Sequence, residues 1–144
     1  MRVIATLVLL FCLFSFLENN KASEYDDVFE AAKNTKGIVL LSFTDESCSW
    51  CYKLKPIFKT PEVQKIINKY FFVEIDITDN PELYNFYKIT TIPAYMLVDG
   101  NKKIIIRGMG YKDKTGFINW LRSYNNTKKE DTNVRQRIKS ATSK

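Results

Sequence analysis

The stretch ESCSWCYK, residues 46–53, places Cys48 and Cys51 with two residues between them, shortly after the apolar run Ile38–Thr44. The residues that follow have a helical pattern, so we expect the pair on a strand-to-helix turn. A C-x-x-C pair there closes a disulfide with little backbone movement, and the positive end of the helix dipole favours the thiolate of the first cysteine. The stretch therefore predicts a redox-active dithiol.

The numbers of cysteine and histidine residues exclude several other kinds of site. The 144-residue chain has three cysteines and no histidine, and its third cysteine, Cys12, lies in the apolar N-terminal segment. One mature chain then has too few soft ligands for a mononuclear four-ligand zinc site. Cys-His nucleophilic catalysis and His-ligated haem are excluded as well. We expect no metal and no cofactor beyond a Cys48–Cys51 disulfide.

The N-terminus has the pattern of an export signal. Arg2 precedes the apolar run Val3–Leu17, which is shorter than the roughly twenty residues of a membrane-spanning helix. We predict a signal peptide over residues 1–22 and a periplasmic or secreted mature protein. An uncleaved membrane anchor is the alternative, and only then do we expect membrane contact.

Composition divides the rest of the chain. Residues 23–124 carry fourteen Lys or Arg against thirteen Asp or Glu and are long enough for one compact α/β domain. Residues 125–144 carry six basic against two acidic residues and almost no large apolar side chains beyond Val134 and Ile138. Such a segment buries too little surface to offset its ordering entropy. We predict a basic tail, disordered or a frayed helix, that mainly solubilises a monomeric protein with no nucleic-acid partner.

Turn residues divide residues 23–124 into alternating helices and strands. Strands are predicted over Ile38–Thr44, Phe71–Thr78, Ala94–Val98 and Lys102–Arg107. Helices are predicted after an N-cap at Ser23, from Cys48 through Pro56, from Pro61, from Pro81 and around Phe117. A tight turn joins the last two strands into a hairpin. This order predicts an α/β fold with a mixed central β-sheet flanked by helices.

Two prolines at fixed distances from the dithiol point to a known family. Pro56 lies eight residues after Cys48, and Ile92-Pro93 lies about forty-five residues after it, before the predicted hairpin. With the C-x-x-C pair, these features resemble the thioredoxin superfamily over nearly all of residues 23–124. The resemblance implies a thioredoxin-like fold and a cis bond before Pro93, in a loop against the dithiol. It also implies that the Ile92 backbone pairs with an extended substrate segment and that Pro93 keeps a backbone donor away from the sulfurs.

Within the superfamily, residues 48–65 resemble the periplasmic and secreted branch, including the C-terminal domain of the membrane thiol:disulfide interchange protein. Three departures from cytoplasmic thioredoxins stand out. Ser49-Trp50 replaces Gly-Pro between the cysteines, Ser47 replaces a tryptophan, and Ser42 replaces a buried aspartate. Because a hydroxyl does not ionise near pH 7, the second thiol needs another proton acceptor. We predict that Glu74, expected on a strand buried on both faces, is this base, and the alternative is a strand register that leaves Glu74 in solvent.

The resulting hypothesis is an extracytoplasmic thiol:disulfide oxidoreductase that exchanges disulfides with proteins. Cys48 is predicted to attack and Cys51 to resolve the mixed disulfide. Trp50 is expected either to dock partners beside the sulfurs or to pack in part, and Ile92 and Pro93 to bind substrate. The periplasmic resemblance favours a reductant, recharged by an upstream partner such as a membrane reductant. A Cu(I)-carrying dithiol and a binding module with a structural disulfide stay open as alternatives.

Overall fold

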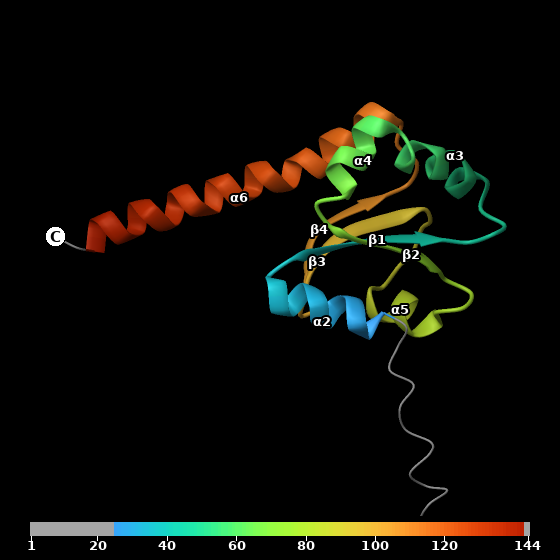
Figure 1. The fold of residues 1–144 in the computed structure, drawn as a ribbon, viewed down its shortest axis with the longest axis horizontal. Coiled ribbons are helices and arrows are strands. Elements are labelled where there is room, and N and C mark those ends of the chain that lie inside the picture. The colour runs from blue at the N-terminus through green and yellow to red at the C-terminus, as the bar shows by residue number, and fades with distance from the viewer. Residues whose placement is uncertain (1–24, 143–144) are drawn as a thin grey trace, which may run out of the picture.

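The computed structural model describes residues 25–142, in which a four-stranded sheet is covered by helices on both faces (Figure 1). The elements in chain order are α2 (Asp26–Thr35), β1 (Ile38–Thr44), α3 (Ser49–Phe58), α4 (Pro61–Ile67), β2 (Phe71–Asp76), α5 (Pro81–Phe86), β3 (Ala94–Asp99), β4 (Ile104–Met109) and α6 (Lys114–Thr142). The predicted signal peptide, residues 1–22, and the predicted N-cap Ser23 lie outside the described residues.

The sheet has the order β2-β1-β3-β4, with β1 and β2 parallel and the other neighbours antiparallel. β1 is a central strand, and all its residues after Ile38 are buried, as its continuous apolar sequence predicts. β2 is an edge strand, so only two of its six residues, Val73 and Ile75, are buried. Because β1 and β2 are parallel, their carboxyl ends lie at the same end of the sheet. The chain passes from β1 into α3 at this end.

Each sheet face carries its own hydrophobic core. The odd-numbered residues of β1, including Leu41 and Phe43, pack in the core that contains buried residues of α2 and α5. Leu40 faces the other way, into the core built with Leu54 and Phe58 of α3 and with Phe117 of α6. Figure 1 shows the corresponding layers, with α2 and α5 on one side of the sheet and α3, α4 and the start of α6 on the other. α3 is thereby fixed to the sheet by its buried side chains.

Two predicted strands have wrong boundaries, and turn side chains bind the backbone at the end of the first strand and before the start of the second. The predicted strand Phe71–Thr78 ends at Asp76, whose Oδ1 accepts the backbone N–H of Thr78 at 2.9 Å. The predicted strand Lys102–Arg107 instead covers Ile104–Met109. Asp99 holds the turn before this strand. Its Oδ1 accepts the backbone N–H groups of Asn101 and Lys103, each at 2.9 Å.

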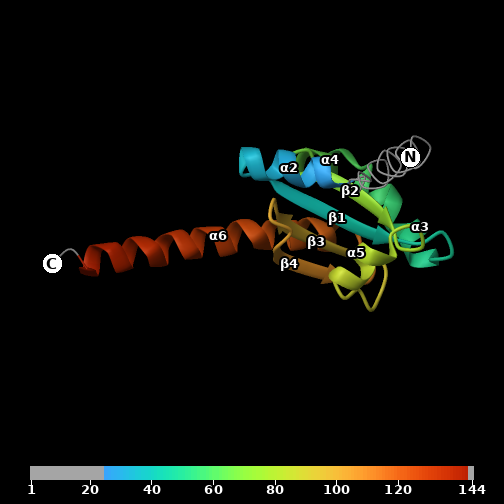
Figure 2. The same cartoon turned by 90° about the horizontal axis from the view of Figure 1, so that it is seen from below.

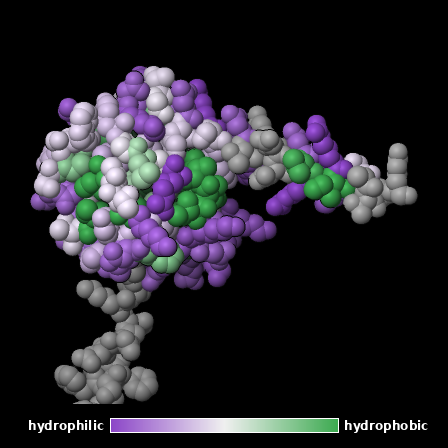
Figure 3. Space-filling view, turned by 180° about the vertical axis from the view of Figure 1, so that it is seen from behind, coloured by the Kyte–Doolittle hydropathy of each residue, from purple (hydrophilic) through white to green (hydrophobic). Residues whose placement is uncertain are grey.

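The basic segment is helical where the structure describes it. α6 runs through residues 125–142 and projects away from the sheet (Figures 1 and 2), so of the two predicted forms of the tail the structure has the helical one here. The first part of α6 is already held as a helix by tertiary packing. Extending such a helix costs far less free energy than nucleating a new one, so residues with little buried surface can continue it. Figure 3 shows apolar and hydrophilic side chains together on this projection, where Val134 and Ile138 are exposed. Among residues 25–142, no helix is long and apolar enough to cross a membrane.

Candidate active site at the Cys48–Cys51 dithiol

The two cysteines occupy the first turn of α3. Cys48 is the N-cap, and Cys51 follows within the helix, with the two Cα atoms 5.2 Å apart and the sulfurs joined in a disulfide. The backbone N–H of Cys51 donates to Sγ of Cys48 at 3.1 Å. A helix-start N–H that donates to this sulfur favours the thiolate of Cys48 once the disulfide is reduced.

The cysteines differ in exposure. Cys51 is 2% exposed, whereas Cys48 is half-buried. A partner therefore reaches the sulfur of Cys48 first, and Cys51 is placed to react only with a sulfur already bound to Cys48. This is the arrangement that the predicted roles of attacking and resolving cysteine require.

The turn before Cys48 is built by an aspartate that the sequence analysis did not single out. Asp45 accepts the backbone N–H of Ser47 at 2.6 Å and the hydroxyl of the same residue, and its own carbonyl accepts the N–H of Cys48 at 3.1 Å. The side-chain hydrogen bond from Ser47, followed by the backbone one, lowers the pKa of Asp45 below its usual value. The D-x-S spacing in residues 45–47 was the available signal, since aspartate commonly caps such turns.

A groove lies beside the dithiol and contains three of the predicted site residues. Trp50, Ile92 and Pro93 line it together, and the peptide bond between Ile92 and Pro93 is cis. The remaining lining residues, not predicted from the sequence, are Thr91, Gly110 and Tyr111. Trp50 is 52% exposed, so it presents its ring at the surface rather than burying it.

The far wall of the groove comes from the loop after β4. The backbone N–H of Gly110 donates to the carbonyl of Pro93 at 2.8 Å, which fixes this loop against the proline loop. Gly110 has a φ of +74°, a left-handed conformation that favours glycine. Tyr111 follows it and packs against Trp50, with ring centroids 5.5 Å apart. The sequence held only an indirect signal of this contact, the paired glycines 108 and 110 that end the strand.

Glu74 does not have the buried environment predicted for it. β2 is an edge strand, and the Glu74 side chain is 36% exposed. Its Oε1 lies 3.0 Å from Nζ of Lys55, whose pKa is raised chiefly by this hydrogen bond. Glu74 is the Cα partner of the buried Ser42 in the parallel pair, but it does not line the groove beside Cys48. The expected desolvation is wrong because β2 is an edge strand and not an interior one, so the burial on which the prediction of a base at Glu74 rested is absent.

We expect Glu74→Gln to have a small effect on both stability and catalysis. Exposed ion pairs contribute about 0.2 to 1 kcal/mol, so the free energy of unfolding should fall by no more than that. The contribution should be present below the unfolded pKa of lysine, about 10.4, and be lost as pH rises through the raised pKa of Lys55. Urea unfolding of the parent and the variant between pH 7 and 11, at intervals of about one pH unit, would measure this contribution to the free energy of unfolding.

The matched control is Lys55→Gln, which removes the other partner of the same pair. Stopped-flow measurement of the first attack and of the resolution step should give nearly the same rates for Glu74→Gln, Lys55→Gln and the parent. Selective slowing of resolution in Glu74→Gln alone would contradict this expectation and restore Glu74 as the proton acceptor of Cys51.

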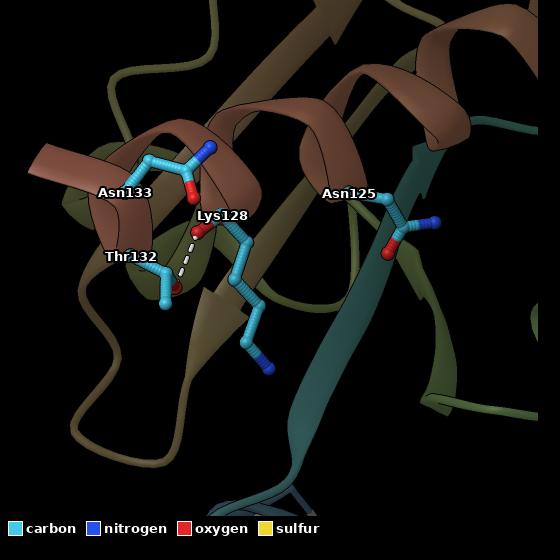
Figure 4. A pocket seen from close by; sticks show the side chains of 4 residues that line it. All are labelled: Asn125, Lys128, Thr132 and Asn133. Atoms are coloured by element: carbon cyan, nitrogen blue, oxygen red, sulfur yellow. Dashed lines mark hydrogen bonds between the residues drawn. The ribbon is translucent and has the colours of Figure 1, made fainter. Parts of the chain in front are cut away.

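Other features of the described residues do not compete with the dithiol. A hollow on α6 is lined by Asn125, Lys128, Thr132 and Asn133, all from one helix (Figure 4). The hydroxyl of Thr132 donates to the carbonyl of Lys128 at 2.8 Å, which is a contact within the helix. Among the residues whose side chains the structure describes, no group of three or more Cys, Asp or Glu residues is assembled as a metal site.

Together, a mixed sheet between two helical layers, a disulfide at the first turn of a helix and a proline loop beside it define a dithiol protein of the thioredoxin-like class. The sequence model of the thioredoxin family matches residues 18–123. The chain therefore belongs to the thioredoxin family.

Individual relatives agree with this assignment. The chain is 26% identical to thioredoxin H2-1 of Oryza sativa subsp. japonica over 102 residues, covering 70% of this chain and 72% of the relative. It is 32% identical to a thioredoxin of Rickettsia bellii (strain RML369-C) over 84 residues, covering 58% and 77%. A solved structure titled DsbH Oxidoreductase superposes with a TM-score of 0.61 at 23% identity, covering 69% of this chain and 80% of that one, and shares the fold.

The chain is thus a thiol:disulfide oxidoreductase, and its dithiol can act on protein thiols and disulfides with no further cofactor. In the reaction expected from the predicted roles of the two cysteines, the Cys48 thiolate of the reduced protein attacks one sulfur of a target disulfide and releases the other as a thiolate. The Cys51 thiolate then attacks Cys48, which forms the Cys48–Cys51 bond and releases the second target sulfur. Two electrons pass to the target, whose two thiolates take up protons, and the reverse sequence oxidises a dithiol.

Proposed function

We propose that this oxidoreductase works outside the cytoplasm as a monomer and reduces disulfides of protein substrates. The observation that carries the substrate class is the half-buried Cys48 beside an open groove lined by Trp50, Ile92 and Pro93. An extended polypeptide can lie in such a groove with its disulfide at Cys48. The apolar run Val3–Leu17 supports export, and the resemblance of residues 48–65 to exported reductants supports the direction.

A reductant that turns over needs a source of electrons. Each cycle leaves Cys48 and Cys51 joined in a disulfide, which must be reduced again by another dithiol. Outside the cytoplasm the glutathione and thioredoxin pools of the cell interior are not available, so the electrons have to cross a membrane. We therefore include a membrane-bound dithiol reductant as the upstream partner in the proposal.

The test is the equilibrium redox potential of the Cys48–Cys51 couple, measured against glutathione redox buffers. We expect a value close to the about −270 mV of thioredoxin. A value close to the about −120 mV of a strong dithiol oxidant would contradict the reductive direction. Cell fractionation of the full-length chain tests the location independently, and recovery in the cytoplasmic fraction alone would contradict export. Size-exclusion chromatography with light scattering tests the monomer.

A further inference from the structure

The groove beside Cys48 has one wall made of two aromatic rings. Trp50 and Tyr111 come from distant parts of the chain, α3 and the loop after β4, and their ring centroids are 5.5 Å apart. Their side chains are 52% and 40% exposed, so much of each ring is open to an incoming group. We call this pair the aromatic wall.

Contacts on both partners hold the aromatic wall in place. Nζ of Lys53 lies 4.2 Å from the centre of the Trp50 ring, a cation–π contact that restrains the ring. Tyr111 directly follows Gly110, whose N–H is bound to the Pro93 carbonyl at 2.8 Å. The wall is therefore tied both to the helix that carries the cysteines and to the loop that carries Pro93.

None of the described residues that line the groove carries a charged side chain. The six lining residues are Trp50, Thr91, Ile92, Pro93, Gly110 and Tyr111. A side chain that enters the groove meets two aromatic rings together with isoleucine and proline. Transfer of apolar surface from water into such surroundings is favourable. A charged side chain would lose hydration there, and the charge nearest the wall among the described contacts, the Lys53 ammonium over the Trp50 ring, would also repel a basic one. Trp50, which lines the groove, lies between the two cysteines in the sequence, in the first turn of α3.

We propose that the aromatic wall selects target segments that carry a bulky apolar side chain next to the attacked cysteine, with Tyr111 as a specificity-determining residue. The inference rests on the proposed action on protein substrates and adds which of them react fastest. Cys48 attacks the target sulfur, and the neighbouring target side chain packs against Trp50 and Tyr111 in the mixed disulfide. Tyr111 acts through its ring, because its contact with Trp50 is between rings.

The test uses two synthetic peptides that each contain one intramolecular disulfide and differ only in the residue next to one cysteine, leucine or serine. Reduced protein and oxidised peptide are mixed, and the second-order rate constant is followed by tryptophan fluorescence. Two electrons pass from the Cys48–Cys51 dithiol to the peptide in each reaction. We expect the parent to react about tenfold faster with the leucine peptide, the size of effect that partial burial of one leucine side chain provides.

Three variants locate the source of this preference. Tyr111→Ala should reduce the ratio of the two rate constants to about twofold, and Tyr111→Phe should keep it near the parent value, because the ring remains. Tyr52→Ala is the matched control: Tyr52 is an exposed aromatic residue of the same helix as Trp50 and does not line the groove. It should leave the ratio unchanged. Circular dichroism confirms that each variant is folded.

Different failures have different meanings. Equal rate constants for the two peptides with the parent protein would overturn the proposed selectivity while leaving oxidoreductase function intact. Equal slowing of both peptides in Tyr111→Ala, with the parent ratio retained, would show a structural role and overturn Tyr111 as a specificity determinant. Absence of reaction with either peptide, in both the reducing and the oxidising direction, would overturn the proposed function itself.

Discussion

Replacement of Cys48 by serine is expected to abolish disulfide exchange completely. Cys48 is the more accessible cysteine and sits at the helix start, where the N–H of Cys51 points at its sulfur. A serine hydroxyl does not ionise near neutral pH and cannot form a mixed disulfide, so the first step has no nucleophile. Reduction of insulin disulfides, followed as turbidity, measures the loss.

Replacement of Cys51 by serine should have a different outcome. The variant keeps the attacking thiol but lacks the buried thiol that releases the target. We therefore expect a single attack followed by a stable covalent complex with the target, visible on a non-reducing gel and released by dithiothreitol. This variant is also the reagent for trapping natural substrates from an extract.

Alkylation kinetics of the reduced parent provide an independent measurement of the two roles. Iodoacetamide should modify Cys48 well before Cys51, because alkylation requires an exposed thiolate. The control is the same reaction in urea, where burial is lost and the two rates should converge. Faster modification of Cys51 in the folded protein at pH 7 would show that the roles are assigned the wrong way round.

The dithiol turn and its surroundings could be predicted from sequence because the signals are local. The apolar run Ile38–Thr44 is β1, and Cys48 starts the helix α3 as expected. Proline in the first turn likewise marks the starts of α4 and α5. In each case the residue that determines the local structure lies within a few positions of it, so no knowledge of the tertiary fold is needed.

The position of Glu74 could not be predicted in the same way. The alternating sequence of β2 is compatible with either a central or an edge strand, and only the strand order decides how much solvent reaches each side chain. The parallel pairing of Ser42 with Glu74 puts the carboxylate on the α3 side of the sheet, but at its open edge, where Lys55 reaches it. A correct strand was thus given an incorrect environment.

Tyr111 was missed for a related reason. It follows the last strand of the sheet and contacts Trp50, sixty-one positions earlier in the sequence. The glycines at 108 and 110 indicate only that the strand ends there, and the contact itself depends on the hairpin of β3 and β4 bringing the end of β4 beside the proline loop. Residues that gain a role only through such pairing are visible in the structure alone.

Replacement of Phe117 by alanine is expected to cause the largest loss of stability among the changes considered. Phe117 is fully buried and its ring lies 5.1 Å from that of Phe58 in α3 and 5.2 Å from that of Tyr95 in β3, between ring centroids. It therefore joins α6 to both the sheet and the helix that carries the cysteines. Removing such a ring leaves a cavity and costs about 3 to 5 kcal/mol, a large part of the roughly 5 to 15 kcal/mol by which a domain is stable.

The matched control for this prediction is Phe86→Ala. Phe86 is also a helix residue with an aromatic neighbour, Tyr87, at a ring distance of 4.8 Å, but it is 60% exposed. Its replacement should cost about 1 kcal/mol or less, because little apolar surface returns to water. Urea unfolding of both variants gives the free energies, provided that the m values match that of the parent. A loss for Phe117→Ala no greater than that for Phe86→Ala would show that α6 is not an integral part of the core, and that the dithiol helix is supported by β1, β3 and α4 instead.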